Sequence, residues 1–189
     1  MDKQLKILIQ NCQKNNPSAQ AELYKTYSAQ LFSVCLRYAD NYEDAQDTFQ
    51  DGFIMIFNKI DQFRFEGSFE GWMRRIMVNT CIEKLRNKNH LYVVNEEITS
   101  NEEPEEYSLD EANEDWEDLT YDELLNLIRQ LPDRYRQVFN LYVIENYSHQ
   151  DIAKILDISV GTSKSNLSRA KEKLKELLKK NTDIKIVSK

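Results

Sequence analysis

The stretch that decides the fold class of this 189-residue chain runs from Tyr147 to Lys175 and reads YSHQDIAKILDISVGTSKSNLSRAKEKLK. Its first part predicts a two-turn helix with Ser148 as the N-cap and an apolar face around Ile152. Residues 157–159 predict a tight turn with Ile158 buried in it, and a second helix is expected to begin at Val160. Two helices joined by such a turn are typical of a helix-turn-helix DNA reader.

The second helix of this motif separates an apolar stripe from a polar face. The stripe consists of Val160, Leu167, Ala170, Leu174 and Leu177. Residues 160–180 carry seven basic side chains against two acidic ones, which favours contact with DNA phosphates. The side chains that we expect to face DNA are Thr162, Lys164, Ser165, Asn166, Ser168, Arg169 and Lys171. A solvated helix in a plain bundle is the alternative, but the tight turn and the helix-start residues favour the DNA reader.

The remainder of the chain also predicts helices. Only four Gly and three Pro occur, and apolar residues recur at spacings of three and four on both sides of the chain's middle. Ser18 is the expected N-cap of the second N-terminal helix. We therefore predict an all-α chain with two small helical domains. Their expected limits are a first domain over 1–90, a linker over 91–120, a second domain over 121–180 and a flexible tail over 181–189.

The acidic charge of the chain belongs to one segment. The formal net charge is −7, yet residues 91–120 hold twelve carboxylates and no basic residue. Without that segment, 25 basic residues face 20 acidic ones, a balance of +5. The composition therefore predicts a mobile acidic linker between two mildly basic domains.

Several classes of protein are excluded by what the sequence lacks. Cys12, Cys35 and Cys81 form no CxxC pair, and only two histidines accompany them, so we expect no metal, no cofactor and no disulfide framework. Free thiols fit the cytoplasm. The N-terminus lacks the pattern of a signal peptide, and no apolar run is long enough to insert into a membrane. A phosphate loop and a nucleophile arrangement are also missing, so the chain is not expected to be an enzyme.

The N-terminal half presents two candidate surfaces. In the helix predicted over Asp47–Ile60, carboxylates lie beside apolar residues on the outer face, which indicates either a protein interface or an ordinary surface helix. The following segment, 63–86, interleaves aromatic residues with Arg, a mixture that suits single-stranded nucleic acid. The alternative is that these aromatics form core, and we favour that role for Trp72 and Phe65. Asn79 is suited to a base edge.

Residues 131–178, LPDRYRQVFNLYVIENYSHQDIAKILDISVGTSKSNLSRAKEKLKELL, resemble region 4 of sigma-70 family factors. The resemblance rests on Leu131-Pro132, Tyr147-Ser148, Asp151-Ile152-Ala153, Val160-Gly161-Thr162, Lys164-Ser165 and Ser168-Arg169-Ala170. It implies that the second domain reads the −35 promoter element and docks on the polymerase flap. Ser163 departs from the family, which commonly has an apolar residue there. A hydrogen bond from Ser163 back to the preceding turn is the expected accommodation.

Residues 44–86, DAQDTFQDGFIMIFNKIDQFRFEGSFEGWMRRIMVNTCIEKLR, are similar to region 2 of sigma factors of the extracytoplasmic-function (ECF) type. The resemblance implies that the first domain binds the clamp helices of core RNA polymerase. The residues implied in that contact are Asp47, Gln50, Asp51, Ile54 and Asn58. It also implies contact with the −10 element, including a base flipped from the stack. The residues implied in that contact are Phe63, Arg64, Arg75, Asn79, Thr80, Lys84 and Arg86.

Together these resemblances imply an alternative sigma factor that binds core RNA polymerase and directs promoter recognition, promoter melting and transcription initiation. An anti-sigma factor is a further implied partner. The linker either mimics the phosphates of nascent RNA or is a solubilising spacer. Two other readings stay open: a stand-alone helix-turn-helix regulator that binds duplex DNA without polymerase, and a protein-interaction adaptor that binds no DNA.

Overall fold

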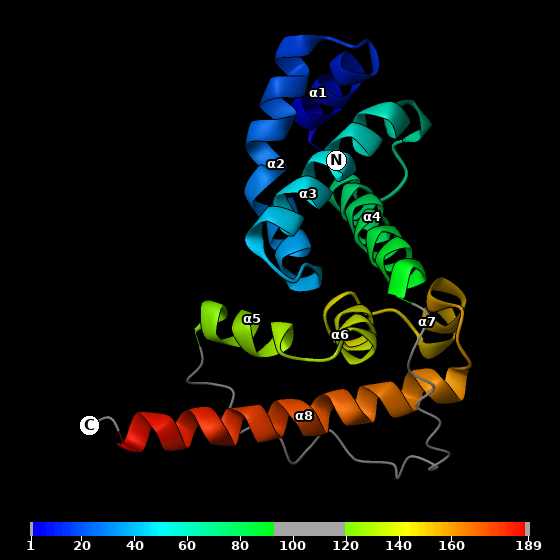
Figure 1. Cartoon of the computed structure of the whole chain (residues 1–189). Helices are drawn as coiled ribbons and strands as arrows, with labels where there is room; N and C mark the ends of the chain where they lie inside the picture. Colours follow the sequence, from blue (N-terminus) through cyan, green and yellow to red (C-terminus); the bar gives the residue numbers. More distant parts are fainter. Residues whose placement is uncertain (1, 93–119, 188–189) are drawn as a thin grey trace. The chain divides into compact units, whose positions relative to one another are not determined.

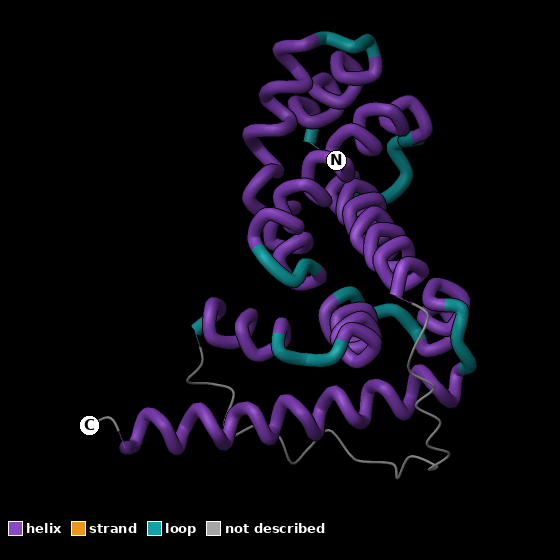
Figure 2. Tube along the Cα trace, viewed as in Figure 1, coloured by secondary structure: helices purple, strands orange, loops and turns teal. Residues whose placement is uncertain are grey.

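The computed structural model describes residues 2–92 and 120–187, so the predicted acidic linker lies almost entirely outside the described residues. The chain divides into two compact units, Met1–Asn95 and Glu96–Lys189. Each unit has its own helices and its own core, and all regular elements in the described part are helical (Figures 1 and 2). The prediction of an all-α chain is confirmed.

The first unit contains four α-helices and a short 3₁₀ turn. They are α1 (Lys3–Gln13), α2 (Pro17–Tyr38), α3 (Tyr42–Lys59), η1 (Ile60–Gln62) and α4 (Phe69–Tyr92). The helices α2, α3 and α4 pack against one another, and α1 packs on α2. Leu31, Ile56 and Met73 come from three different helices and are almost fully buried, so the core lies where α2, α3 and α4 meet.

Asparagine side chains begin two helices of this unit. Asn16, and not the predicted Ser18, is the N-cap of α2, because its side-chain oxygen accepts a hydrogen bond from the Ala19 amide at 3.1 Å. Pro17 follows at the first helical position, which its fixed φ and missing N–H suit. Asn41 caps α3 in the same way and accepts from the Asp44 amide at 2.8 Å.

The crossing of α3 and α4 depends on a glycine. Gly52 lies in the middle of α3 and is buried against Met77 of α4, which is fully buried. A Cβ atom added at Gly52 would overlap the sulfur and the methyl group of Met77. The missing side chain therefore lets the two helices approach closely at this point.

Two cysteines meet between α2 and α4. The sulfur atoms of Cys35 and Cys81 lie 3.9 Å apart, although the residues are far apart in sequence. Both thiols are buried and reduced, as is the thiol of Cys12 in α1. All three therefore serve as apolar side chains of the core of the first unit.

Over its described residues, 120–187, the second unit contains four α-helices and one π-helical turn. They are α5 (Tyr121–Arg129), α6 (Asp133–Phe139), η3 (Asn140–Ile144), α7 (His149–Leu156) and α8 (Val160–Val187). The shorter helices α5, α6 and α7 each pack against the long helix α8, along which they lie in Figure 1. The helix α8 continues through residue 187, whereas a flexible tail was expected from residue 181.

The buried stripe of α8 differs at both ends from the predicted one. Leu167, Ala170 and Leu174 are buried as expected, but Val160 is 40% exposed. Leu178 is buried at the other end, and Leu177 is only half-buried.

Candidate nucleic-acid interface

The helix-turn-helix is built by local hydrogen bonds at each helix end. Ser148 caps α7, where its oxygen accepts from the Asp151 amide at 3.2 Å and its hydroxyl donates to the Asp151 carboxylate at 2.6 Å. Asp157 ends α7 in the left-handed conformation, with a φ of 55°. Ser159 then accepts from the Thr162 amide at 2.9 Å and so begins α8. The turn occupies residues 157–159, as predicted, although Ile158 is half-buried and not fully buried.

Most of the side chains expected to face DNA reach the surface of α8. Thr162 and Lys164 are exposed, and four others are half-buried: Ser165, Ser168, Arg169 and Lys171. The expectation for Asn166 is wrong in this structure, because its side chain is only 7% exposed. The cause is its register, since Asn166 stands one turn from the fully buried Ser163 on the inward side of the helix.

Some of these polar side chains already have partners within the helix. The Thr162 hydroxyl lies 2.8 Å from the Ser159 hydroxyl, and the Ser165 hydroxyl donates to the Thr162 carbonyl at 3.0 Å. These bonds orient the first turn of α8. Lys164 remains as the exposed cation of that turn.

Ser163 is accommodated by a partner that the sequence did not reveal. Its side chain is fully buried, and its oxygen lies 2.9 Å from Nδ1 of His149. The hydrogen bond therefore joins α8 to α7. The sequence had predicted a bond from Ser163 back to the preceding turn instead. The imidazole of His149 also stacks on the ring of Tyr142 in η3, with centroids 4.4 Å apart and planes inclined by 21°.

The environment of His149 favours its neutral form. Burial lowers the pKa of the imidazole, and the positive charges of Lys164 and Lys171 lower it further. The ring therefore acts at neutral pH as an uncharged hydrogen-bonding group.

On the first unit, one face of α3 carries the residues that the resemblance assigns to polymerase. This α3 face consists of Asp47, Gln50, Asp51, Ile54 and Asn58. All five are exposed, because spacings of three and four place them on one side of the helix. Ile54 is 58% exposed, which leaves an apolar side chain among carboxylates. The Asp51 carboxylate lies 3.6 Å from Nζ of Lys84 in α4, so this face reaches the neighbouring helix.

Phe63 is buried, in contrast to the expected contact with a base. Only 4% of the side chain is exposed, and its ring packs within 5.5 Å of the rings of Phe65, Phe69 and Trp72, measured between centroids. Phe65 and Trp72, for which a core role was favoured, are half-buried. Phe63 is therefore more buried than either of them, the reverse of the expected order. Phe63 follows η1, and its ring packs against Phe69 and Trp72 of α4, which the residue pattern alone did not show.

The other residues that the resemblance assigns to the −10 element lie on α4 and in the loop before it. Exposed positions of α4 recur every three or four residues at Gly71, Arg75, Asn79, Glu83 and Arg86. Arg64 in the loop is also exposed. The Thr80 hydroxyl donates to the Ile76 carbonyl at 3.0 Å, and Lys84 is half-buried beside Asp51. The structure therefore gathers Arg75, Asn79 and Arg86 on one face and places Thr80 and Lys84 at its margin.

Two family models match the chain and cover these two units. Residues 23–90 match the model of sigma-70 region 2, and residues 116–174 match that of sigma-70 region 4. A relative that is 32% identical over 185 residues is the ECF RNA polymerase sigma factor SigW of Bacillus subtilis. That alignment covers 95% of this chain and 99% of the relative.

The chain belongs to the ECF group of the sigma-70 family. It is therefore an alternative sigma factor, of the family that directs transcription initiation. The RNA polymerase sigma-H factor of Pseudomonas aeruginosa is 28% identical, over 90% of this chain and 92% of its own length. Among solved structures, the sigma factor RpoE from Bartonella quintana, in complex with the anti-sigma factor NepR, has the same fold. The TM-score is 0.52 at 20% identity, over 84% of this chain and 96% of that one.

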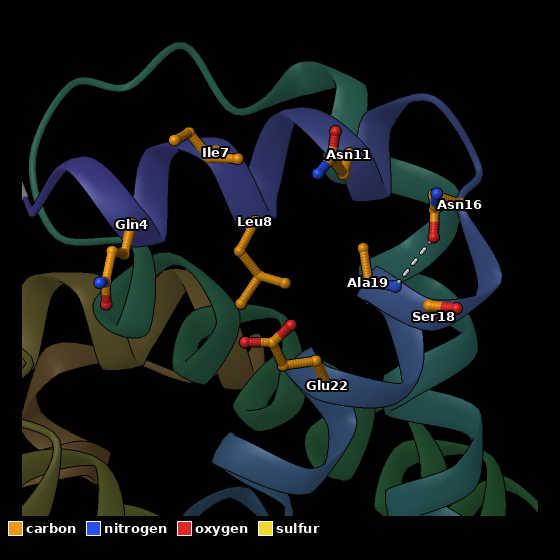
Figure 3. A pocket seen from close by; sticks show the side chains of 8 residues that line it. All are labelled: Gln4, Ile7, Leu8, Asn11, Asn16, Ser18, Ala19 and Glu22. Atoms are coloured by element: carbon orange, nitrogen blue, oxygen red, sulfur yellow. Dashed lines mark hydrogen bonds between the residues drawn. The ribbon is translucent and has the colours of Figure 1, made fainter.

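Outside these surfaces, the first unit of the sigma factor has a groove between α1 and α2 (Figure 3). Leu8 and Ala19 supply apolar walls, and Glu22 supplies a carboxylate. None of the predicted contact residues lines this groove. Within residues 2–92 and 120–187, no group of three or more His, Cys, Asp or Glu side chains is placed to hold a metal ion. Over the same residues, no helix combines the length and apolar character that crossing a bilayer demands.

Proposed function

We propose that the two units of this sigma factor divide promoter recognition between them. The second unit reads the −35 element with the first turns of α8, and the first unit binds core polymerase through the α3 face and the −10 element through α4. The observation that carries this proposal is the helix-turn-helix, whose second helix presents Thr162 and Lys164 at its exposed N-terminal end. Such a helix end is the part that enters a major groove.

The α3 face supports the assignment of polymerase binding. An apolar side chain as exposed as that of Ile54 gains free energy when a partner covers it, and the carboxylates around it give the contact its orientation. The face of α4 with Arg75, Asn79 and Arg86 combines two cations with an amide, which suits phosphates and a base edge of an opened strand.

Among the aromatic residues of the segment 63–72, Phe65 and Trp72 have half-buried rings that an extruded base can reach. Phe63 supports this contact from within the core, because its ring packs against the rings of Phe65 and Trp72. Phe65 has a positive φ of 61°, which is unusual for a bulky side chain and is typical of strained backbone at functional loops.

The sigma factor acts by binding and has no catalytic activity of its own in this proposal. Its place is the cytoplasm, with core RNA polymerase and promoter DNA. An anti-sigma factor is a proposed partner, because the structural relative from Bartonella quintana is bound to one.

Run-off transcription with purified core polymerase and a genomic promoter library tests the proposal. The full chain should start transcripts only together with core, and it should bind duplex promoter DNA weakly by itself. A chain that binds one duplex tightly without core and starts no transcript would instead be a stand-alone regulator.

Two variants assign the surfaces in the same assay. Lys164→Ala should weaken promoter binding of the holoenzyme and reduce its salt dependence by about one phosphate contact. Lys175→Ala is the matched control, because Lys175 is an exposed cation farther along α8. Ile54→Ala should weaken the affinity for core, whereas Ile7→Ala, which changes an isoleucine of similar exposure on α1, should not. Equal effects of Lys164→Ala and Lys175→Ala would remove the special role of the α8 N-terminus.

A further inference from the structure

The contact between the two helices of the helix-turn-helix has a polar centre. His149 is the first residue of α7, and its Nδ1 lies 2.9 Å from the buried Ser163 oxygen in α8. The stack on Tyr142 fixes the plane of the imidazole ring. One histidine thus connects α7, α8 and η3 at a single point.

Ser163 lies in the first turn of α8. It lies between Thr162 and Lys164, two exposed polar residues of the turn that is proposed to read DNA. Successive residues of a helix share one rigid backbone, so a bond that holds the Ser163 side chain also fixes where Thr162 and Lys164 point.

A buried hydroxyl constrains this contact more than an apolar side chain would. Two apolar surfaces can slide past each other at small cost, whereas a displacement of α8 along α7 would leave the Ser163 hydroxyl buried without its partner. The hydrogen bond between the buried Ser163 hydroxyl and His149 therefore favours one register of the two helices.

We propose that His149 is a positioning residue for promoter recognition, which fixes the first turn of α8 against α7 through its hydrogen bond to Ser163. This inference rests on the proposed role of α8 in reading the −35 element. His149 itself needs no contact with DNA, because it acts through the orientation of its neighbours on α8.

The charged surroundings of His149 make this role dependent on pH. Burial lowers the pKa of the ring, the positive charges of Lys164 and Lys171 of α8 lower it further, and Tyr142 of η3 stacks on it. At acid pH below this lowered pKa, the ring becomes a third positive charge beside two lysines, and repulsion from the α8 cations then disturbs the contact between the helices.

Two possible roles of His149 predict opposite effects of acid pH on DNA binding. If His149 contributed only charge, its protonation would strengthen binding to DNA phosphates. If it positions α8, protonation weakens the discrimination between a matched and a scrambled −35 element. The ratio of these two affinities is therefore the quantity to measure, since loss of folded protein lowers both affinities together and leaves the ratio unchanged.

The experiment uses holoenzyme made from the full chain and a promoter duplex obtained by run-off selection, with a second duplex scrambled in the −35 element. We expect Ser163→Ala and His149→Phe each to reduce the affinity ratio roughly 3- to 10-fold, the range for loss of one hydrogen bond. The double variant should reduce it no further than the more affected single variant. Gln150→Ala, at the exposed neighbour of His149 on α7, should keep the wild-type ratio.

A pH series provides the second readout. The ratio of the wild type should stay constant above the ordinary histidine pKa of about 6.5 and fall as the pH drops below it, because the pKa of His149 is lowered. The ratio of His149→Phe should stay flat over the same series. Single variants with the wild-type ratio, or a His149→Phe profile that follows the wild type, overturn the positioning role. If Lys164→Ala weakens binding in that case, only the positioning role fails. If Lys164→Ala has no effect, the assignment of DNA reading to α8 fails and the positioning role fails with it.

Discussion

At the scale of single residues, Arg136 is a charged side chain inside the core of the second unit. It is 2% exposed, its guanidinium donates to the Asp133 carboxylate at 2.7 Å, and it also donates to the Arg129 carbonyl at 3.2 Å. The arginine therefore ties α6 to the last turn of α5. A buried cation of this kind needs its acceptors, because water cannot replace them.

Asp133→Ala should destabilise the second unit by about 1–3 kcal/mol, since it leaves the buried guanidinium without its carboxylate. The estimate is below that for a fully buried pair because the Asp133 side chain is 40% exposed. Hydrogen–deuterium exchange of the full chain should show faster exchange in α5 and α6. Glu172→Ala, at an exposed position of α8, is the control. Equal exchange in the two variants would contradict the structural role of the pair.

At the scale of elements, the crossing of α3 and α4 predicts that one glycine-to-alanine change destabilises the protein while another stabilises it. Gly52→Ala forces the Met77 side chain to move, and overpacking of this kind costs about 1–3 kcal/mol, which exceeds the roughly 1 kcal/mol gained in helix propensity. Gly71→Ala in the first turn of α4 meets only the Ser68 side chain, at an ordinary 3.5 Å. It should raise the free energy of unfolding by up to about 1 kcal/mol.

Denaturant titration of the full chain, followed by a signal from the first unit, measures both changes. Met77→Ala should cost less in the Gly52→Ala background than in the wild type, because the shorter side chain makes room for the new methyl group. Destabilisation by both glycine variants, with no coupling to Met77, would mean that the crossing does not depend on Gly52.

At the scale of the whole molecule, the thiols report on one of the two units. Cys12, Cys35 and Cys81 all lie in the core of the first unit, and burial together with Glu22 raises the pKa of Cys12. An aromatic disulfide reagent should therefore react slowly with the native chain and fast in denaturant, because thiolate forms only when the unit opens. Gly52→Ala should speed the labelling, and Asp133→Ala should leave it unchanged. Acceleration by Asp133→Ala would show that the two units open together.

The stability of the second unit also depends on pH. The pKa of His149 is lowered in the folded chain, so the unfolded chain binds a proton at higher pH than the folded chain does. The contribution of the neutral ring is complete above the ordinary histidine pKa of about 6.5 and is lost as the pH falls below it.

Elements whose causes are local could be predicted from the order of the residues. The turn at residues 157–159 follows from Ser148, Asp157 and Ser159, which form their bonds within three or four residues. The α3 face was also predictable, because a helical spacing decides which residues share a side. The two family resemblances, and with them the function as a sigma factor, likewise needed only the order of residues.

The packing of the helices sets which of their sides are covered and which distant residues meet. The partner of Ser163 was not predictable because His149 stands fourteen residues earlier on another helix. Phe63 and Asn166 are buried although the sequence placed them on exposed surfaces, since the crossing of other helices determines how far a buried stripe extends. The periodicity of a sequence predicts which residues share one face of a helix. Whether that face is buried depends on a second surface that packs against it, and this surface comes from elsewhere in the chain.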